Sequence, residues 1–139
     1  MALLTVGKEV TKKARLYLME ITLPSKMVVV KIGKASGPSS VNRMMQIVES
    51  VYQKFRRTPM IYIKKDQEVL SDVVFKYETI LHNFFKDYQY VTPHKFTGST
   101  ECFTIPLSDG LQAYEAVLQG LVPEHTYVLP EASEDALPF

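Results

Sequence analysis

The chain has 139 residues, a formal net charge of +1 at pH 7 and one cysteine. This length predicts one domain with a single core. The single cysteine excludes an internal disulfide, and no apolar run is long enough to cross a membrane. We therefore expect a cytoplasmic protein without a membrane partner. Four of the 15 acidic residues and no Lys or Arg follow Leu121, which predicts a basic N-terminal arm (1–14), a mildly basic domain (15–121) and an acidic C-terminal tail (122–139).

Two strand-like segments open the predicted domain. Residues 15–21 and 28–32 are rich in β-branched and large apolar side chains, and the Pro-Ser-Lys sequence between them favours a turn. They predict a hairpin in which Tyr17 and Lys31 lie on neighbouring strands. The second strand ends at Gly33 between two lysines, so it delivers cations to a loop.

The rest of the domain alternates helix and strand signals. Apolar residues at three-and-four spacing predict helices, and turn formers separate them from short apolar runs. The first element is a helix over 41–55, and the next are a strand over 60–63 and a helix over about 68–88. A loop over 90–100, a strand over 101–105 and a helix that is capped by Ser108 and Asp109 and ends at Gly120 follow. The predicted buried stripe of the first helix is Val41, Met44, Met45, Val48, Val51, Tyr52 and Phe55. The predicted fold class is α+β, with a small mixed three-stranded sheet flanked by helices, a C-terminal helix and an acidic tail.

Several motifs on these elements, in this order, resemble the GIY-YIG nuclease superfamily. Leu16-Tyr17 stands for the first half of its signature and Lys31-Ile32-Gly33-Lys34 for the second, with a lysine in place of the second tyrosine. Arg43 falls in the helix after the glycine. The segment 77–82 matches a Glu-x-x-Leu-His form and 100–103 matches a Glu-x-Phe form. The Lys-Ile-Gly variant is similar to the phage-type branch of the superfamily.

The resemblance implies an enzyme that acts on DNA. It implies a divalent-metal-dependent endonuclease or nickase of phage or mobile-element type, which hydrolyses phosphodiester bonds with Mg²⁺ or Mn²⁺, in the host cytoplasm if it is phage-encoded. Either the tyrosine or the lysine of the signature is the general base. The implied catalytic residues are Tyr17, Lys31, Arg43 and His82, the implied metal ligand is Glu78, and the implied nucleic-acid contacts are Gly33, Lys34 and Lys95.

The chemistry of phosphodiester hydrolysis suits these residue types. Mg²⁺ prefers carboxylate oxygen and keeps several waters, so one glutamate such as Glu78 holds it together with a substrate phosphate. The planar, permanently charged guanidinium of Arg43 suits the non-bridging phosphoryl oxygens. Tyr17 has an ordinary pKa of about 10, so as general base it needs a cation such as Lys31 to favour the phenolate.

Structural interpretations stay open beside these. Tyr17 is alternatively a packed core residue, Lys31 and Lys34 are alternatively surface lysines that protect a strand end, and the charged helix residues are alternatively solvated or paired with each other. His82 is alternatively a core histidine, and Glu101 is either a second acidic site residue or an edge-strand glutamate. The alternative function is a catalytically weak or inactive protein on the same fold that binds DNA or DNA-processing proteins.

The tail ends in a pattern of its own. Residues 131–139 are an acidic run followed by Leu-Pro-Phe, which resembles the tip of bacterial single-stranded-DNA-binding proteins. A terminal phenylalanine offers a ring for an apolar pocket and an α-carboxylate for a basic rim. Pro138 and Phe139 are therefore predicted to bind host proteins that read this tip. The alternatives are a solvated terminus, or a flap over the protein's own DNA surface.

Overall fold

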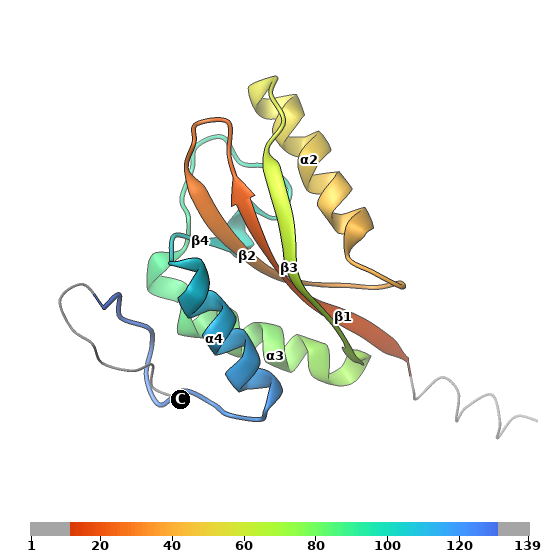
Figure 1. The fold of residues 1–139 in the computed structure, drawn as a ribbon, viewed down its shortest axis with the longest axis vertical. Helices are drawn as coiled ribbons and strands as arrows, with labels where there is room; N and C mark the ends of the chain where they lie inside the picture. Colours follow the sequence, from red (N-terminus) through yellow and green to blue (C-terminus); the bar gives the residue numbers. More distant parts are fainter. Residues whose placement is uncertain (1–11, 131–139) are drawn as a thin grey trace, which may run out of the picture.

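In the protein, described for residues 12–130 by a computed structural model, helices lie on both faces of one sheet (Figure 1). No helix in this part of the chain is long and apolar enough to cross a membrane. The elements are, in chain order, β1 (Lys13–Thr22), β2 (Val28–Ala35), α2 (Val41–Phe55), β3 (Met60–Leu70), α3 (Ser71–Phe84), the 3₁₀ turns η1 (Lys86–Tyr88) and η2 (Ser99–Glu101), β4 (Cys102–Phe103) and α4 (Leu107–Leu118).

The sheet has four strands in the order β3-β1-β2-β4, and each neighbouring pair is antiparallel. The α+β class is confirmed, but the expectation of a mixed, three-stranded sheet is wrong on both points. After β2, the chain passes through α2 and returns beside β1 as β3, antiparallel to it, so no parallel pair forms. The short strand β4 then adds to the free edge of β2 and becomes the fourth strand.

The central strand β1 is buried on both faces of the sheet. Its alternating side chains point to opposite faces and enter two separate cores. Leu16 and Leu18 pack with residues of α3 and α4, whereas Tyr17 and Met19 pack with Ile47 of α2. Burial of each such apolar side chain contributes about 1.5–3 kcal/mol. The hydroxyl of Tyr17 is therefore presented on the α2 face of the sheet.

Helix α2 has the predicted bounds but a different buried stripe. Its buried residues are Ile47 and Val51, whereas Val41, Met45 and Tyr52 of the predicted stripe are about half exposed. Apolar residues occupy more of the helix circumference than the sheet covers, so spacing alone does not decide which of them face it.

The third strand is longer than predicted, and the helix after it is shorter. β3 continues to Leu70 and α3 spans Ser71–Phe84, whereas the sequence predicts a strand over 60–63 and a helix over 68–88. The missed part of β3 is the polar run Lys-Lys-Asp-Gln-Glu. This strand forms an edge of the sheet, where exposed charged side chains are tolerated and discourage pairing with other chains.

The packed body extends beyond both ends of the predicted domain. β1 begins at Lys13, inside the expected arm, of which residues 1–11 lie outside the described residues. Past residue 121, Tyr127 is 1% exposed, and its hydroxyl donates a hydrogen bond to Asp109. Asp109 is thus not the cap of α4, which has no side-chain cap bond. The Tyr127 ring packs against the rings of Phe84, Phe85 and Tyr88.

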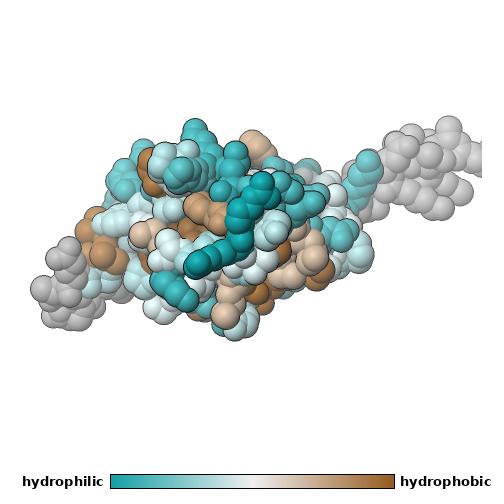
Figure 2. All heavy atoms as spheres, turned by 90° about the horizontal axis from the view of Figure 1, so that it is seen from above, coloured by the Kyte–Doolittle hydropathy of each residue, from teal (hydrophilic) through white to brown (hydrophobic). Residues whose placement is uncertain are grey.

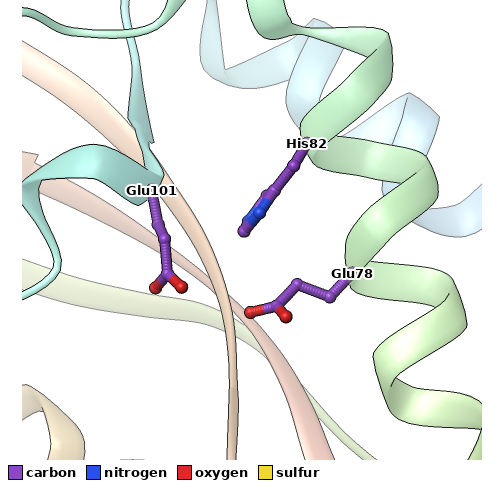
Figure 3. Close-up of side chains that lie close together, drawn as sticks. All are labelled: Glu78, His82 and Glu101. Carbon is purple, nitrogen blue, oxygen red and sulfur yellow. The ribbon is translucent and has the colours of Figure 1, made fainter.

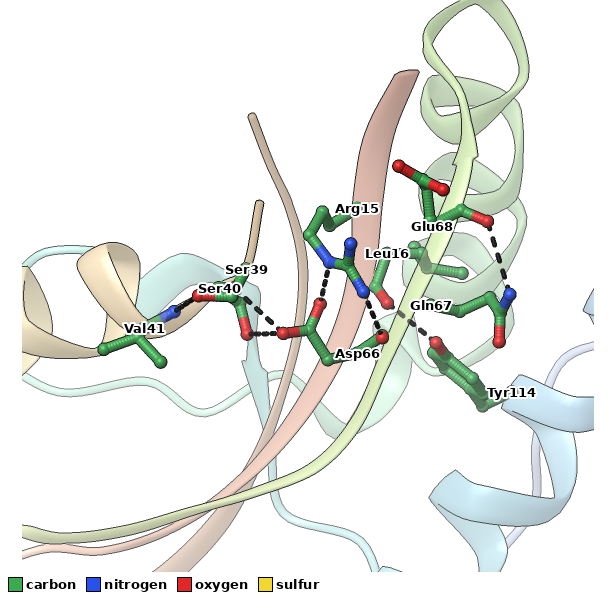
Figure 4. A network of polar contacts seen from close by, with 9 residues as sticks. All are labelled: Arg15, Leu16, Ser39, Ser40, Val41, Asp66, Gln67, Glu68 and Tyr114. Carbon is green, nitrogen blue, oxygen red and sulfur yellow. Dashed lines mark hydrogen bonds and ion pairs between the residues drawn. The ribbon is translucent and has the colours of Figure 1, made fainter. Parts of the chain in front are cut away.

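A polar network ties the start of α2 to the sheet (Figure 4). One carboxylate oxygen of Asp66 on β3 accepts a bond from Nε of Arg15 at 2.5 Å, and the other accepts from the backbone N–H and the hydroxyl of Ser40 at 2.9 and 2.8 Å. Ser40 is the buried N-cap residue of α2, where a negative charge is favoured by the helix dipole. Burial opposes ionisation of Asp66, but the bonds from Arg15 and Ser40 outweigh it and lower the pKa of this carboxyl.

Replacing Asp66 by Ala is expected to destabilise the protein by about 3 kcal/mol, because it removes the acceptor of the two Ser40 groups and of Arg15 Nε, while the bond from Arg15 Nη2 to the backbone oxygen of residue 66 remains. Since the folded-state pKa of Asp66 is lowered, this contribution is present above the ordinary Asp pKa and is lost as the pH falls through the lowered value. Urea unfolding at neutral and at acidic pH measures both effects. Glu68→Ala is the control, because Glu68 pairs with Lys13 on an exposed surface, where a pair contributes at most about 1 kcal/mol. Equal losses in the two variants would contradict the prediction.

Candidate functional site

The hairpin register sets Tyr17 against a glycine. Tyr17 of β1 is directly opposite Gly33 of β2. A Cβ atom at residue 33 would lie 2.4 Å from the Tyr17 hydroxyl oxygen and 2.6 Å from its Cζ, so only glycine leaves room for the phenol. Gly33 therefore positions the Tyr17 hydroxyl, while direct contact of Gly33 with DNA stays a prediction.

Lys31 is buried beside this hydroxyl. Its exposed fraction is 1%, and its Nζ donates to the Tyr17 hydroxyl at 2.8 Å and to Oε1 of Glu101 at 2.6 Å. Gly98, with a φ of +80°, lies against the lysine stem, because a Cβ atom there would be 2.3 Å from the Lys31 Cε. The predicted meeting of Tyr17 and Lys31 is confirmed, and Lys31 is not a surface lysine.

Burial and pairing set the ionisation of Tyr17, Lys31 and Glu101. Burial raises the pKa of the Tyr17 phenol, and the Lys31 charge offsets this only in part. Burial lowers the pKa of Lys31, but Tyr17 and Glu101 outweigh it, so that pKa is raised. Burial raises the pKa of Glu101, but Lys31 outweighs it, so that pKa is lowered. At neutral pH Tyr17 is therefore a phenol, Lys31 an ammonium and Glu101 a carboxylate. The positive charge of Lys31 does not convert Tyr17 to a phenolate before the reaction starts.

A contact of His82 connects α3 to β2 close to the residue at which β4 begins. β4 pairs with β2 only at Val30 and Lys31. Next to this pair, Nε2 of His82 lies 2.6 Å from the carbonyl oxygen of Ile32. Because a carbonyl oxygen only accepts hydrogen bonds, Nε2 carries the proton, and Nδ1 is the only nitrogen with a free lone pair in the neutral ring.

Glu78 lies one helical turn before His82 on α3, and both side chains point toward Glu101 (Figure 3). Oε1 of Glu78 pairs with Nζ of Lys34 at 3.4 Å. Oε2 is buried and has no hydrogen-bond partner within residues 12–130. A buried carboxylate oxygen without a donor is costly unless a cation faces it, so this atom indicates a place for a ligand.

The donor groups around this oxygen fit a divalent metal. One ligand atom from each of Glu78, His82 and Glu101 lies within 4.8 Å of the other two. Two atoms bound to one Mg²⁺ at about 2.1 Å are at most about 4.2 Å apart, so small side-chain shifts let the donors share one ion. The two carboxylates are donors that Mg²⁺ and Mn²⁺ prefer, and the imidazole is a donor that transition metals prefer.

Arg43 lies on the first turn of α2, on the side of the sheet that carries Tyr17. Its side chain is half-buried and donates to Oε1 of Gln46 at 3.3 Å. Its positive charge acts on the Tyr17 hydroxyl. Arg43 is therefore within electrostatic reach of the buried group without contacting it, which leaves its guanidinium donors for a substrate anion.

The remaining residues that were predicted to bind DNA are not donors of the Glu78 cluster. Lys34 is exposed, pairs with Glu78 and lies over the Phe75 ring, 5.8 Å from its centroid. Lys95 is exposed on the loop before η2, outside the Glu78 cluster. Pro138 and Phe139 lie outside the described residues.

Glu101 and Gly98 complete the site beyond the residues assigned from the sequence. The Glu-x-Phe pattern is a signal for Glu101, although it leaves the choice between a site residue and an edge-strand residue open. The contact with Lys31 places Glu101 in the site. Gly98 stands in a loop of turn-forming residues and carries no signal, because its packing against the lysine stem depends on a distant part of the chain.

A comparison with family models matches the T5orf172 domain over residues 15–118, a range that includes all of the cluster described above. This is a phage-associated, nuclease-like domain related to GIY-YIG and HNH-type endonucleases. Searches of curated proteins and of solved structures give no match.

Proposed function

The chain belongs to the T5orf172 domain family, and from this premise we propose that it is a divalent-metal-dependent endonuclease or nickase of the phage-type GIY-YIG branch, acting on DNA phosphodiester bonds. The observation that carries the proposal is Oε2 of Glu78, which is buried without a hydrogen-bond partner within residues 12–130, on a carboxylate that lies close to His82 and Glu101. A carboxylate oxygen that is buried without a donor destabilises the fold, so a purely structural role does not explain it. A role as ligand of Mg²⁺ or Mn²⁺ explains it, because the metal becomes its partner.

The charged side chains divide the tasks of phosphodiester cleavage. Glu78 holds the metal, with Glu101 and His82 as the neighbouring donors. When bound there, the metal stabilises negative charge on the leaving oxygen as a Lewis acid. Arg43 offers a planar fork of donors for the non-bridging oxygens of the phosphate.

Tyr17 and Lys31 are hydrogen-bonded to each other but have different roles in the proposed reaction. Lys31 is held as an ammonium by two hydrogen bonds, so it serves as a fixed cation and not as the general base. The Tyr17 oxygen accepts one of these bonds and keeps a lone pair and its own proton for a water or a substrate oxygen. Tyr17 is thus the candidate to orient the attacking water and to take its proton as the reaction proceeds.

A DNA-binding role without turnover is the second candidate. It is favoured by the two lysine pairs, Lys31 with Glu101 and Lys34 with Glu78, which neutralise both acids without a metal. The first candidate requires only the weaker of these pairs to open, since Lys34 is exposed and its Nζ is 3.4 Å from Glu78. Only the lysine of this pair is exposed, since the Glu78 side chain is 7% exposed, so a bound divalent cation has to replace the charge of Lys34 at the buried carboxylate.

A plasmid-nicking assay separates these functions. We expect the protein to convert supercoiled DNA to nicked or linear forms with Mg²⁺ or Mn²⁺ and to leave it intact with excess chelator. The same preparation with Arg43→Ala controls for contaminating nucleases and is expected to lose about 10²–10³-fold in rate, as when one oxyanion donor is removed. Binding without cleavage under every metal condition would support the second candidate, and cleavage that survives chelation would overturn metal dependence.

A further inference from the structure

One end of the molecule carries a group of basic side chains outside the site. Lys54, Arg56 and Arg57 are exposed at the end of α2, which lies at the top of Figure 1. The loop before η2 reaches the same place, because the Phe55 and His94 rings are in edge contact with centroids 5.8 Å apart. Lys95, the next residue, is exposed as well. We call Lys54, Arg56, Arg57 and Lys95 the basic end.

The segments that carry these charges contain no acidic residue. Residues 50–65 and 88–100, which include all of the basic end, contain no Asp or Glu. Within the part of the chain that the structure describes, no ion pair involves any of the four side chains. Figure 2 views the molecule from this end and shows strongly hydrophilic side chains across the middle of the surface. Uncompensated positive charge of this kind attracts a polyanion.

The basic end is joined to the site by two segments that run alongside each other. α2 runs from Arg43, near Tyr17, to the basic end, and the loop before η2 runs back from Lys95 to Gly98 at the Lys31 stem. The backbone N–H of Thr97 donates to the Ser50 hydroxyl at 2.8 Å, so the two segments touch between their ends. From residue 43 to 55 the helix rises about 18 Å.

Resting on the proposed nuclease function, we propose that the basic end is a second DNA contact, which holds backbone phosphates of duplex DNA that runs along α2 from the site. At 3.4 Å per base pair, the helix rise corresponds to about five base pairs. The basic end therefore meets phosphates about half a helical turn from the bond that is cleaved. This contact adds affinity without sequence preference, and it gives Lys95 a partner although Lys95 is outside the metal cluster.

The test measures DNA binding and does not require cleavage. Fluorescence anisotropy with a labelled duplex of about two helical turns, in excess chelator, gives the dependence of log K on log salt. Replacing both Arg56 and Arg57 by Ala is expected to reduce the magnitude of this slope by about 1.8, because each lost phosphate contact removes about 0.9. Lys64→Ala with Lys76→Ala removes the same charge from exposed positions on β3 and α3 and is expected to leave the slope nearly unchanged.

The outcomes distinguish this contact from the proposed activity. Equal slopes for the two double variants would overturn the basic end as a contact, even if the plasmid assay shows cleavage. A reduced slope for the arginine variant alone supports it, even if no metal gives cleavage. Circular dichroism of both variants verifies that the slopes compare folded proteins, and unfolding of the arginine variant shifts the test to Lys95→Ala, with an expected change of about 0.9.

Discussion

Glu78→Gln is expected to lower metal-dependent cleavage by about 10³-fold or more while the protein keeps its fold. The substitution conserves volume and removes the charge of the one carboxylate whose buried oxygen has no partner within residues 12–130. A metal supplies several kcal/mol of charge stabilisation in the transition state, and each 1.36 kcal/mol is a factor of ten in rate. The variant leaves Lys34 exposed to solvent, and the neutral amide removes the cost of burying a carboxylate at a side chain that is 7% exposed, so the thermal midpoint is expected to move by only a few degrees.

Manganese binding by calorimetry or electron paramagnetic resonance gives a readout that does not depend on turnover. Glu115→Gln is the matched control, since Glu115 is also a helical glutamate paired with a lysine, Lys65, but on α4. The control is expected to bind Mn²⁺ and to cleave DNA like the unchanged protein. Full cleavage by Glu78→Gln, or equal Mn²⁺ binding by both variants, would remove Glu78 from the metal site.

Tyr17→Phe is expected to lose at least about 100-fold in cleavage rate at every pH, because it removes the hydroxyl that accepts a bond from Lys31 and that we propose orients the attacking water. Burial raises the pKa of Tyr17 and Lys31 lowers it in part. If the phenolate takes the proton, the rate of the unchanged protein therefore rises with pH beyond the ordinary tyrosine pKa.

Lys31→Met removes the positive charge that lowers the pKa of Tyr17, so the activity profile of this variant is expected to shift to higher pH. Single-turnover rates across the alkaline range measure this shift.

Two results would contradict these roles. An active Tyr17→Phe variant with a Lys31→Met variant that is inactive at all pH values would transfer the central role to Lys31. A Lys31→Met profile that is lower but unshifted would mean that Tyr17 does not titrate in the reaction and acts only as a hydrogen-bond donor. Thermal unfolding of both variants is the necessary control, because each removes a buried polar group from a paired set.

Short-range patterns predicted the hairpin at the centre of the site. Strand-forming residues on both sides of a short turn allow few registers, and a shift by one residue would exchange the buried and exposed faces. Tyr17 and Lys31 therefore lie on neighbouring strands as the sequence predicted, whereas the position of Gly33 opposite Tyr17 comes from the register that the structure shows. The three-and-four spacing likewise places Glu78 and His82 on one face of α3, as Figure 3 shows.

The same patterns failed where a residue's environment depends on its position in the sheet. The polar run in β3 does not look like a strand, because its charged side chains are acceptable only at a sheet edge. Asp66 within that run carried no signal, yet it holds the N-cap of α2 through Ser40. Its partners Arg15 and Ser40 are brought to it by the pairing of β1 with β3 and by the return of α2.

The sequence by itself determined which chemical groups are available: a tyrosine on one strand of a hairpin, a lysine and a glycine on the next, and a glutamate and a histidine one turn apart on a helix. Only the tertiary structure decided which of them meet. Glu101 lies 70 positions after Lys31 and reaches it because β4 docks on β2. Oε2 of Glu78 has no hydrogen-bond partner among residues 12–130, because α3 buries that side chain and Lys34 pairs with Oε1. Such contacts depend on strand order and burial, which are properties of the whole folded chain and are not encoded in any short segment.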